Sequence, residues 1–445
     1  MEKLKYVIED STIAELLGTQ NFTNKESAIL ELVKNSYDAK ASKLTISFEP
    51  NMIVMTDDGM GMGSKDIKSH WMHIGKSNKK YEIIDFNHRK RVLSGSKGIG
   101  RFALSRLGEQ VAVYSKKRNL SGIVWDTDWN SSTISEEKSL KKHGTRIEIM
   151  GLRDKWGPKA ISDLSEFLAK TYNDDTMEID IHSNGEITSV SKYFPDPQLG
   201  INCLSSIQMT YDSANHTLRM VIKSDEFLDK AREYHTQYDI CKYEVNTNIL
   251  EEFKTVQNWD LSTEELSGNL HGLGDFSAIM LFNINSPSVE MEKFLYKYNN
   301  IPNSLTGGMI LYRNAFSISS YEGKKDWLGL GKRSRQSPAA ASHPTGAWRV
   351  RENQLAGKVE IDKKNNRFLR DLSNRQGLDE NVFYELFVEI ILVGIKEFER
   401  YRQEIIRSID KKNNSESEEK AWPISEKVLS NPSSVSTLSK KKQNS

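Results

Sequence analysis

A glycine-rich turn directly after an apolar strand constrains this chain more than any other feature. The strand covers residues 52–55, and the turn that follows reads Asp57-Asp58-Gly59-Met60-Gly61-Met62. Two glycines separated by one residue let the backbone approach a ligand closely, and a carboxylate at a strand end can accept a hydrogen bond from an exocyclic amine. The same residues also suit an acidic hairpin turn, because Asp-Gly favours such turns. Taken alone, the segment leaves a ligand site and a hairpin turn equally open.

A second group of polar residues lies on a predicted helix before this strand. Residues 23–26 form a capping-box pattern with the Thr as the cap, and apolar residues follow at helical spacing, so the sequence predicts a helix over 24–39. Glu31, Asn35 and Asp38 share one face of that helix. A carboxylate and a carboxamide that face the same way can hold a water molecule and a hard cation. A solvated helix face is the alternative interpretation.

A third segment is a glycine-rich loop that opens another helix near Gly100. Such a loop offers free backbone N–H groups to a phosphate. It is not a P-loop, because Gly100 is followed by Arg101 rather than by Lys and then Ser or Thr. It fits the dinucleotide fingerprint only as a bare pattern, since residues 116–119 read Lys-Lys-Arg-Asn where a ribose-binding acid is expected. Gly144-Thr145, at the start of a predicted strand, is a fourth and weaker signal.

The order and spacing of these four segments resemble the GHKL ATPase superfamily, which includes gyrase-type topoisomerases, the large heat-shock chaperones, histidine kinases and MutL. The resemblance covers about residues 10–150 and is closest to MORC-like and chaperone-like bacterial ATP-binding proteins. It implies an α/β (α+β) fold in which helices pack on a mixed sheet and ATP is bound in the Bergerat manner. The first histidine is His70, so the phosphate-accepting histidine that precedes the ATP domain of histidine kinases is missing, and that branch is not favoured.

The resemblance also implies roles for single residues. Glu31 would activate the attacking water as a general base, and Asn35 would coordinate a Mg²⁺ ion that bridges the triphosphate of ATP. Asp57 would bind the adenine amino group, helped by Thr145 through a water, and the loop up to Gly100 would be the ATP lid. The remaining nucleotide-binding residues that the resemblance implies are Asp38, Gly59, Gly61, Met62, Lys76, Gly95, Ser96, Lys97, Gly98, Ile99, Gly100, Arg101 and Phe102. Gly59 and Gly61 would give the base room.

The second region resembles the transducer domain that follows the ATP domain in several GHKL branches. There a basic residue reaches the γ-phosphate, and Lys332 is the expected sensor, with Arg313 and Arg333 as rivals. Residues 321–370 hold 12 Lys or Arg against 5 Asp or Glu. A basic surface or a nucleic-acid patch is therefore the alternative interpretation of this stretch.

The expected organisation has three parts. Residues 1–155 form the ATP-binding domain, and 156–400 form the transducer-like domain with an extra segment at about 180–280. Apolar residues from Val382 to Ile395 predict a helix that runs to about residue 408. Residues 401–445 are expected to be the end of this helix and a disordered polar tail.

Composition and charge indicate the cellular location of the protein. The net charge of the 445 residues is only +1, and two cysteines cannot build a disulfide framework or a zinc site. Glu9-Asp10 stands where a signal peptide needs an apolar run, and the apolar stretch 390–395 is too short to cross a bilayer. We therefore expect a cytoplasmic protein without a membrane segment.

The expected function is a Mg²⁺-dependent ATPase that works as an ATP-gated dimeric switch or clamp. DNA is the first expected partner, because of the basic stretch and the resemblance, and defence against phage is the setting that the resemblance suggests. Two alternatives stay open at this point. One is a chaperone-like remodeller of proteins, and the other is a nucleotide-sensing module that regulates a partner protein with little turnover.

Overall fold

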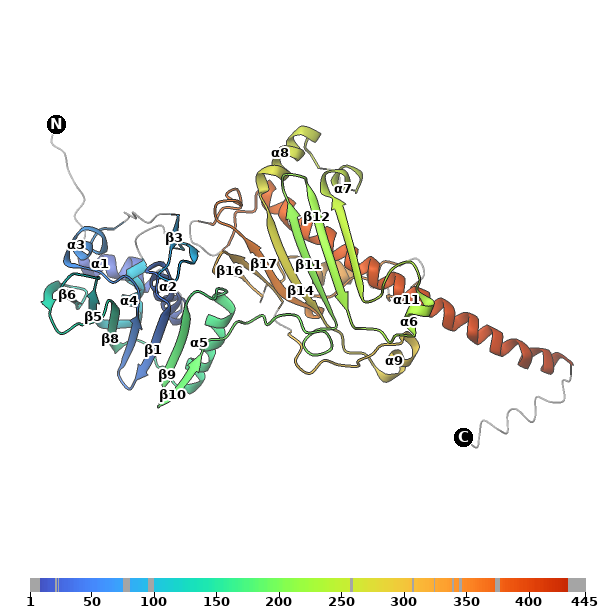
Figure 1. Cartoon of the computed structure of the whole chain (residues 1–445), viewed down its shortest axis with the longest axis horizontal. Helices are drawn as coiled ribbons and strands as arrows, with labels where there is room; N and C mark the ends of the chain where they lie inside the picture. Colours follow the sequence, from blue (N-terminus) through green and yellow to red (C-terminus); the bar gives the residue numbers. More distant parts are fainter. Residues whose placement is uncertain are drawn as a thin grey trace. The chain divides into compact units, whose positions relative to one another are not determined.

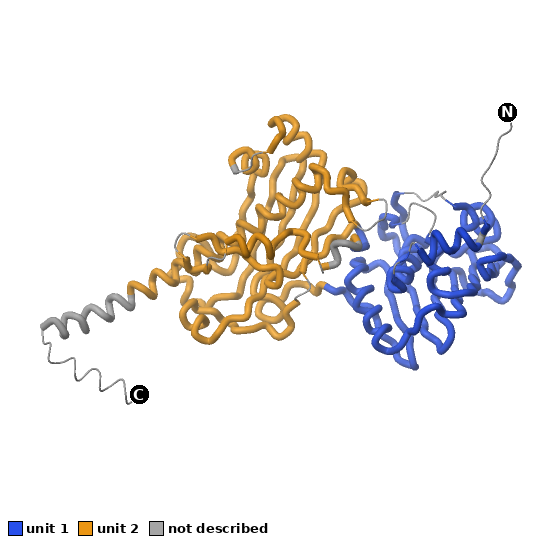
Figure 2. The backbone as a smooth tube through the Cα atoms, turned by 180° about the vertical axis from the view of Figure 1, so that it is seen from behind, with its two compact units in different colours: residues 1–193, 314–317 blue, residues 194–313, 318–445 orange. Residues whose placement is uncertain are grey.

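The computed structural model divides the chain into two compact units, which are described one at a time (Figure 2). The first unit comprises residues 1–193 and 314–317, and the second comprises 194–313 and 318–445. The structure describes residues 9–430 apart from 21, 23, 75–80, 95–99, 257–258, 306–307, 324, 338–339, 344–345 and 373–376. The first unit thus continues beyond residue 155, where the sequence placed a boundary.

The first unit contains, within the described residues, an eight-stranded sheet in the order β10-β9-β1-β2-β8-β5-β6-β7 (Figure 1). Its strands are β1 (Lys43–Glu49), β2 (Met52–Asp57), β5 (Gly108–Lys116), β6 (Gly122–Thr127), β7 (Ser132–Glu137), β8 (Gly144–Leu152), β9 (Glu178–Ser183) and β10 (Glu186–Ser189). Neighbouring strands are antiparallel except β1 and β9, which pair in parallel. This pairing of β9 with β1 is the reason why the first unit continues past residue 155. The expected α/β fold with a mixed sheet is confirmed.

Helices and a small hairpin complete the first unit. They are α1 (Asp10–Ala14), η1 (Glu15–Thr19), α2 (Lys25–Asp38), α3 (Ser64–Asp66), η2 (Ile67–Trp71), η3 (Gly100–Phe102), α4 (Ala103–Leu107), α5 (Pro158–Thr171) and the hairpin β3 (Glu82–Ile84) and β4 (Lys90–Val92). Helix α2 packs its apolar side on the sheet, where Ile29 and Leu32 join Ile46 and Val113 in one buried cluster. This packing fixes the polar side of α2 beside the ends of β2 and β8.

The cap of α2 differs from the prediction. The Oδ1 atom of Asn24 accepts a hydrogen bond from the backbone N–H of Ser27 at 2.7 Å, so Asn24 is the N-cap and the helix begins at Lys25. Asn and Thr both serve as caps, and the capping-box pattern alone does not decide between adjacent residues of these types. The Thr at position 23, which we expected to be the cap, lies outside the described residues.

The second unit is built on a seven-stranded sheet, within the described residues, in the order β13-β12-β11-β14-β17-β15-β16. Its strands are β11 (Ser205–Asp212), β12 (Thr217–Ser224), β13 (Lys242–Asn248), β14 (Phe276–Phe282), β15 (Met309–Arg313), β16 (Phe316–Glu322) and β17 (Leu355–Ile361). Its helices are α6 (Ala231–Tyr234), α7 (Ile249–Val256), α8 (Thr263–Leu273), α9 (Ser288–Phe294), α10 (Leu330–Gln336), η4 (Glu352–Gln354) and α11 (Val382–Ser430). The segment 180–280 therefore supplies whole strands of this sheet.

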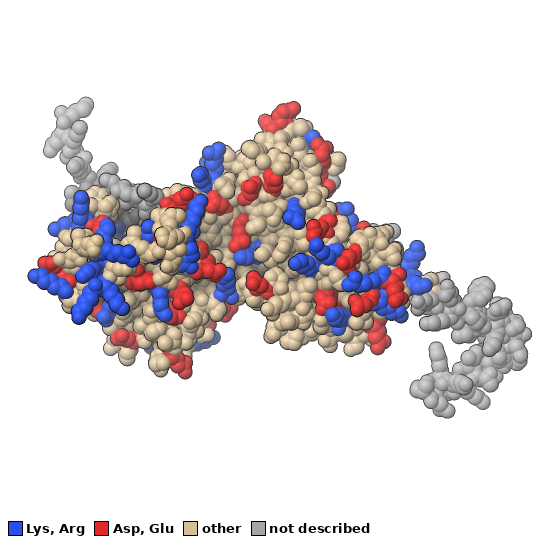
Figure 3. Space-filling model, in the orientation of Figure 1, with Lys and Arg blue, Asp and Glu red and all other residues tan. Residues whose placement is uncertain are grey.

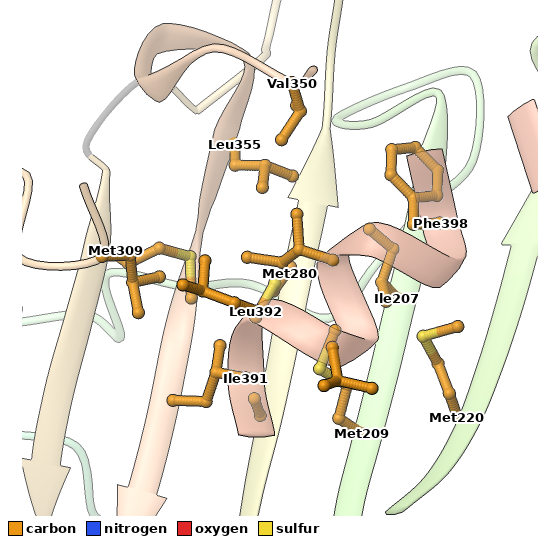
Figure 4. Packing of buried hydrophobic residues seen from close by; sticks show 14 of the residues in the cluster. Ile207, Met209, Met220, Met280, Met309, Val350, Leu355, Ile391, Leu392 and Phe398 are labelled. Carbon is orange, nitrogen blue, oxygen red and sulfur yellow. The ribbon is translucent and has the colours of Figure 1, made fainter. Parts of the chain in front are cut away.

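Helix α11 packs across one face of the second sheet (Figure 4). Ile391 and Leu392 lie on the same buried cluster as Met209 and Met280 of the strands. At Gly394 the helix approaches the sheet most tightly, since an added Cβ would lie 2.6 Å from the sulfur of Met209. The helix continues to Ser430, past the expected end near 408, and in the described residues no helix is long and apolar enough to cross a membrane.

Candidate functional site

The carboxylate of Asp57 is the centre of the candidate site. It lies at the end of β2 and accepts hydrogen bonds from the N–H of Gly59 (2.9 Å), the hydroxyl of Ser36 (3.0 Å) and the backbone of Thr145. Burial raises the pKa of Asp57 to about 6, and the three donors oppose that rise. A carboxylate has about four acceptor positions, so the three donors found among the described residues leave one acceptor position for a further donor.

The turn after Asp57 is packed against the backbone of neighbouring elements. An added Cβ at Gly59 would lie 2.7 Å from the carbonyl oxygen of Ala39, at the end of α2. Gly61 has a φ of +66°, and an added Cβ there would clash with the carbonyl of Lys116 at the end of β5. These close approaches require glycine at both positions. In the direction of a side chain, both glycines therefore face protein backbone.

A polar network joins the turn to strands β5 and β8. The hydroxyl of Ser115 accepts a hydrogen bond from the N–H of Met62 at 2.8 Å and lies 2.9 Å from the hydroxyl of Thr145. Gly144 has a φ of +129°, and an added Cβ would clash with the carbonyl of Asp57. Met62 and Thr145 are thus held at the same end of the sheet as Asp57.

Helix α2 holds both ends of the glycine-rich segment 95–99, which itself lies outside the described residues. At the beginning, the carboxylate of Asp38 accepts hydrogen bonds from the N–H (2.9 Å) and the hydroxyl (3.2 Å) of Ser94. At the end, an added Cβ at Gly100 would lie 2.5 Å from Oε1 of Glu31. Asp38, which the resemblance placed on the nucleotide, therefore anchors the start of the loop.

Basic and aromatic residues follow the loop. Burial lowers the pKa of Arg101 to about 10, and its guanidinium lies 4.6 Å from the centre of the Phe102 ring. A cation that has lost part of its hydration is stabilised by a nearby anion. Arg101 also donates to the carbonyl oxygen of His73 at 3.3 Å, and the ring of Phe102 is buried at the start of α4.

The remaining predicted residues divide into three groups. Asn35 is half-buried on α2, between the buried carboxylates of Glu31 and Asp38 in sequence. Lys76 and the predicted lid residues Gly95, Ser96, Lys97, Gly98 and Ile99 lie outside the described residues. Lys332 belongs to the second unit, where it is exposed on α10.

The two rivals of Lys332 have structural roles in the second unit. Arg333 donates to the buried carboxylate of Glu399 at 2.6 Å, and Arg349 pairs with the same carboxylate at 3.0 Å. Arg313 pairs with Asp371 at 2.9 Å and donates to the carbonyl of Leu369. Both rivals are thus used to hold the fold together.

Three functional contacts were missed from the sequence. Ser36 donates to Asp57, Ser115 joins Met62 to Thr145, and Nδ1 of His143 lies 2.8 Å from the carbonyl oxygen of Gly59. Ser115 pairs directly with Thr145 in the β5–β8 ladder, so a correct strand register would have revealed that contact. Ser36 and His143 carried no comparable signal.

Comparison with known proteins agrees with the arrangement of the first unit. The family described as "Histidine kinase-, DNA gyrase B-, and HSP90-like ATPase" matches residues 23–153. The chaperone protein HtpG of Borreliella burgdorferi is 25% identical over 169 residues, which are 33% of this chain and 27% of that protein. The DNA mismatch repair protein MutL of Crocosphaera subtropica is 28% identical over 146 residues, 32% of this chain and 26% of MutL.

A further relative has a different description. The putative type II restriction enzyme HgiDII of Herpetosiphon aurantiacus is 27% identical over 141 residues, 29% of this chain and 23% of that enzyme. The chain thus spans about a quarter of the length of the curated relatives that it matches. Residues 23–153 thus match the ATP-binding domain of the GHKL superfamily, in agreement with the superfamily resemblance.

Proposed function

We propose that the protein binds ATP with Mg²⁺ in the first unit, hydrolyses it, and uses the bound nucleotide to set its conformation. The observation that carries this proposal is the Asp57 carboxylate, which three protein donors orient and which retains an acceptor position for one more donor. The exocyclic amine of adenine is such a donor. The match of residues 23–153 to ATPases supports the same assignment.

The residues present fit a magnesium nucleotide. Bound ATP supplies the phosphoanhydride bond that water cleaves, and Mg²⁺ neutralises charge on its phosphates. Asn35 offers a carboxamide oxygen to the cation, and Asp57 orients the adenine. Glu31 accepts the proton of the attacking water, a general-base role worth about 10²–10⁴ in rate. Arg101 and the amides of the loop up to Gly100 bind phosphate oxygens.

The attachment of the loop explains how nucleotide binding changes the conformation. Asp38 holds Ser94, and Glu31 lies against Gly100, so helix α2 senses both ends of the loop. Because Gly100 lies against Glu31, a phosphate bound near Gly100 would affect the position of the Glu31 carboxylate. Binding of phosphate and positioning of the general base Glu31 are then coupled.

This proposal is tested by measuring ATP hydrolysis with and without the general base Glu31. We expect Glu31→Ala to bind Mg-ATP with an affinity close to that of the wild type and to lose at least about 10²-fold in turnover. Asp57→Ala is the corresponding substitution at the adenine-binding residue. It should abolish ATP binding, because adenine loses its charged acceptor. Normal turnover in Glu31→Ala, or normal ATP affinity in Asp57→Ala, would contradict the assigned roles.

We further propose that ATP closes two copies into a clamp that holds DNA. The basic stretch 321–370 and the similarity to a DNA mismatch repair protein support DNA as the partner. A chaperone-like remodeller of proteins is the second candidate, and the similarity to HtpG favours it. ATP-dependent, salt-sensitive retention on circular DNA distinguishes the two, because only the clamp remains on a closed circle.

Two finer assignments belong to the same proposal. Lys332 is the γ-phosphate sensor, which the structural use of Arg313 and Arg333 supports. Defence against phage is the proposed setting and rests on the resemblance. Infected cells that carry the wild-type gene should survive better than cells that carry Glu31→Ala, and equal survival would contradict that setting.

A further inference from the structure

A strongly basic surface lies beside the candidate site in the first unit. It is formed by the turn between β5 and β6 and by the loop between β7 and β8, and we call it the lysine surface. Its cations are Lys116, Lys117, Arg118, Lys138, Lys141 and Lys142. All of them except the half-buried Lys116 are exposed, and Figure 3 shows Lys and Arg side chains gathered on this part of the first unit.

The charge of this surface is a local concentration. Residues 116–122 and 138–142 contain no acidic residue, whereas the whole chain has a net charge of only +1. Nearby carboxylates belong to Asp66, which pairs with Lys117 at 3.2 Å, and to Glu136 and Glu137 on β7. Six cations minus three carboxylates leave a net charge of +3. A surface of this kind attracts a polyanion.

The two loops are joined and line one hollow. Nζ of Lys116 donates to the carbonyl oxygen of Leu140 at 2.7 Å, which ties the β5–β6 turn to the β7–β8 loop. Together the loops line a shallow hollow of about 540 Å³, in which Lys116, Lys138 and Lys141 surround Asn119 and Ser121. Cations and neutral hydrogen-bond donors therefore converge on one place.

An exposed aromatic ring stands at the edge of the lysine surface. Phe86, in the turn between β3 and β4, is 38% exposed. Its ring centre lies 4.4 Å from the guanidinium of Arg118 and 5.5 Å from the ring of His143, so both loops contact it. The turn is held by Asp85, whose carboxylate accepts a hydrogen bond from the N–H of Asn87 at 2.8 Å. The ring is thus presented on a fixed turn.

We propose that the lysine surface and Phe86 bind single-stranded nucleic acid. Lysines that follow a surface contact successive phosphates, and an exposed aromatic ring stacks on an unpaired base. The combination of a basic groove and an aromatic platform is what binds single strands without sequence preference, whereas a duplex keeps its bases stacked on one another. The proposal deepens the DNA-binding function proposed above and depends on it for its purpose.

The same loops contact the candidate ATP site. The carbonyl of Lys116 packs against Gly61, and Nδ1 of His143 lies 2.8 Å from the carbonyl oxygen of Gly59. A strand held on the lysine surface would therefore press on the turn that follows Asp57. This contact gives a route by which nucleic acid changes ATP affinity within one unit.

Binding of labelled dT20 and rU20 by the full-length protein, without ATP, tests the proposal by fluorescence anisotropy at several salt concentrations. The variant is Lys141→Gln with Lys142→Gln, and the matched control is Lys155→Gln with Lys159→Gln. Each double substitution removes two exposed lysines. The first pair lies before β8 and the control pair lies after it, and the nine residues of β8 separate the two pairs by roughly 30 Å. A duplex of the same length and ATP binding are measured in parallel.

We expect the variant to weaken dT20 binding at least about tenfold and to lower the salt slope by about one, with the control unchanged. Phe86→Ala should weaken dT20 binding by about tenfold and leave duplex binding unchanged. Comparable loss with rU20 places DNA and RNA alike on the surface, and loss with dT20 alone restricts the ligand to DNA. Either result supports the proposal.

Several results would overturn the proposal. Equal effects of variant and control would do so, as would stronger binding of the duplex than of dT20, or absence of dT20 binding at 50 mM salt. These results do not bear on ATP hydrolysis, because nucleic-acid binding is measured without nucleotide. Loss of ATP binding in the wild type together with intact dT20 binding would overturn the proposed ATPase and leave this surface standing.

Discussion

At the scale of single residues, the protonation of Asp57 governs the proposed nucleotide site. Burial raises the pKa of Asp57 to about 6 from the usual value near 4. The carboxylate is therefore mostly ionised at pH 7 and mostly protonated at pH 5, and the ionised form is the better acceptor for an amine. ATP affinity should fall roughly tenfold from pH 7 to pH 5.

ATP affinity at each pH is measured by calorimetry. Because the nucleotide also titrates in this pH range, the measurement needs a control protein in which residue 57 cannot bind a proton. Asp57→Asn retains an oxygen acceptor and has no carboxyl group to titrate. The difference in pH dependence between the wild type and Asp57→Asn isolates the Asp57 proton. Identical curves for the two proteins would show that the Asp57 carboxylate does not contact the nucleotide.

Gly100 allows a test of the position of Glu31. An added Cβ would lie 2.5 Å from Oε1 of Glu31, the far end of a flexible side chain, so Gly100→Ala should displace the carboxylate with little effect on the fold. We expect a fall in kcat of at least about tenfold, with a change in unfolding free energy within about 1 kcal/mol. An unchanged kcat would mean that Glu31 does not need this position.

The sequence predicted which residues lie near Asp57 better than it predicted the protein contacts that they make. Asp57 and Thr145 were predicted to act together, and the register of β2 with β8 places them directly opposite each other. Asp38 is expected to bind the nucleotide, and the structure adds a contact with Ser94 that the sequence did not predict. A pattern shows which polar side chains share a helix face, whereas the partner that each one meets depends on a loop that returns from far along the chain.

At the scale of elements, a buried ion pair joins α11 to the rest of the second unit. The Arg402 guanidinium contacts the Glu226 carboxylate at 2.6 Å, and both side chains are nearly inaccessible to solvent. Arg402→Ala would leave the Glu226 carboxylate buried without this partner. We expect the second unit to lose about 3–5 kcal/mol of unfolding free energy, measured by urea denaturation.

A paired substitution separates the charge effect from lost packing. Arg402→Met combined with Glu226→Leu removes both charges and keeps most of the buried volume, so it should cost clearly less than Arg402→Ala alone. If the double variant is as unstable as the single one, packing around Arg402 and not the uncompensated charge determines the stability.

Lys332 and its neighbour on α10 should behave oppositely. Lys332→Ala removes an exposed side chain, so stability and ATP binding should stay near wild type while ATP turnover slows at least about tenfold. Arg333→Ala should instead destabilise the second unit, because the buried Glu399 loses a partner at 2.6 Å. Normal turnover in Lys332→Ala would assign the sensor role elsewhere.

The sequence predicted elements with strong periodicity and missed their ends. The apolar face that begins at Val382 identified α11, but no Gly or Pro lies between 409 and 422, and the helix continues through this polar stretch. Polar residues with good helix propensity are easily taken for a disordered tail. Among the residues of α11 whose burial is described, which end at 415, Ile409 is the last buried apolar one.

At the scale of the whole molecule, the division into two units follows spatial contacts that composition does not reveal. Residues 314–317, which are the turn after β15 and the first two residues of β16, belong to the first unit although the residues on either side of them belong to the second. Phe316 packs edge-on against Tyr37 of α2 at 5.3 Å, and its ring also contacts Tyr172. No local pattern in these four residues predicts such a contact.

The central claim, that ATP gates the conformation and assembly of the protein, also concerns the whole molecule. The most direct measurement is light scattering of Glu31→Ala with and without Mg-ATP, since this variant should bind ATP without consuming it. We predict a shift from one chain of 50.8 kDa to twice that mass on addition of Mg-ATP. An unchanged mass with ATP bound would contradict the gated clamp and indicate a nucleotide-sensing module.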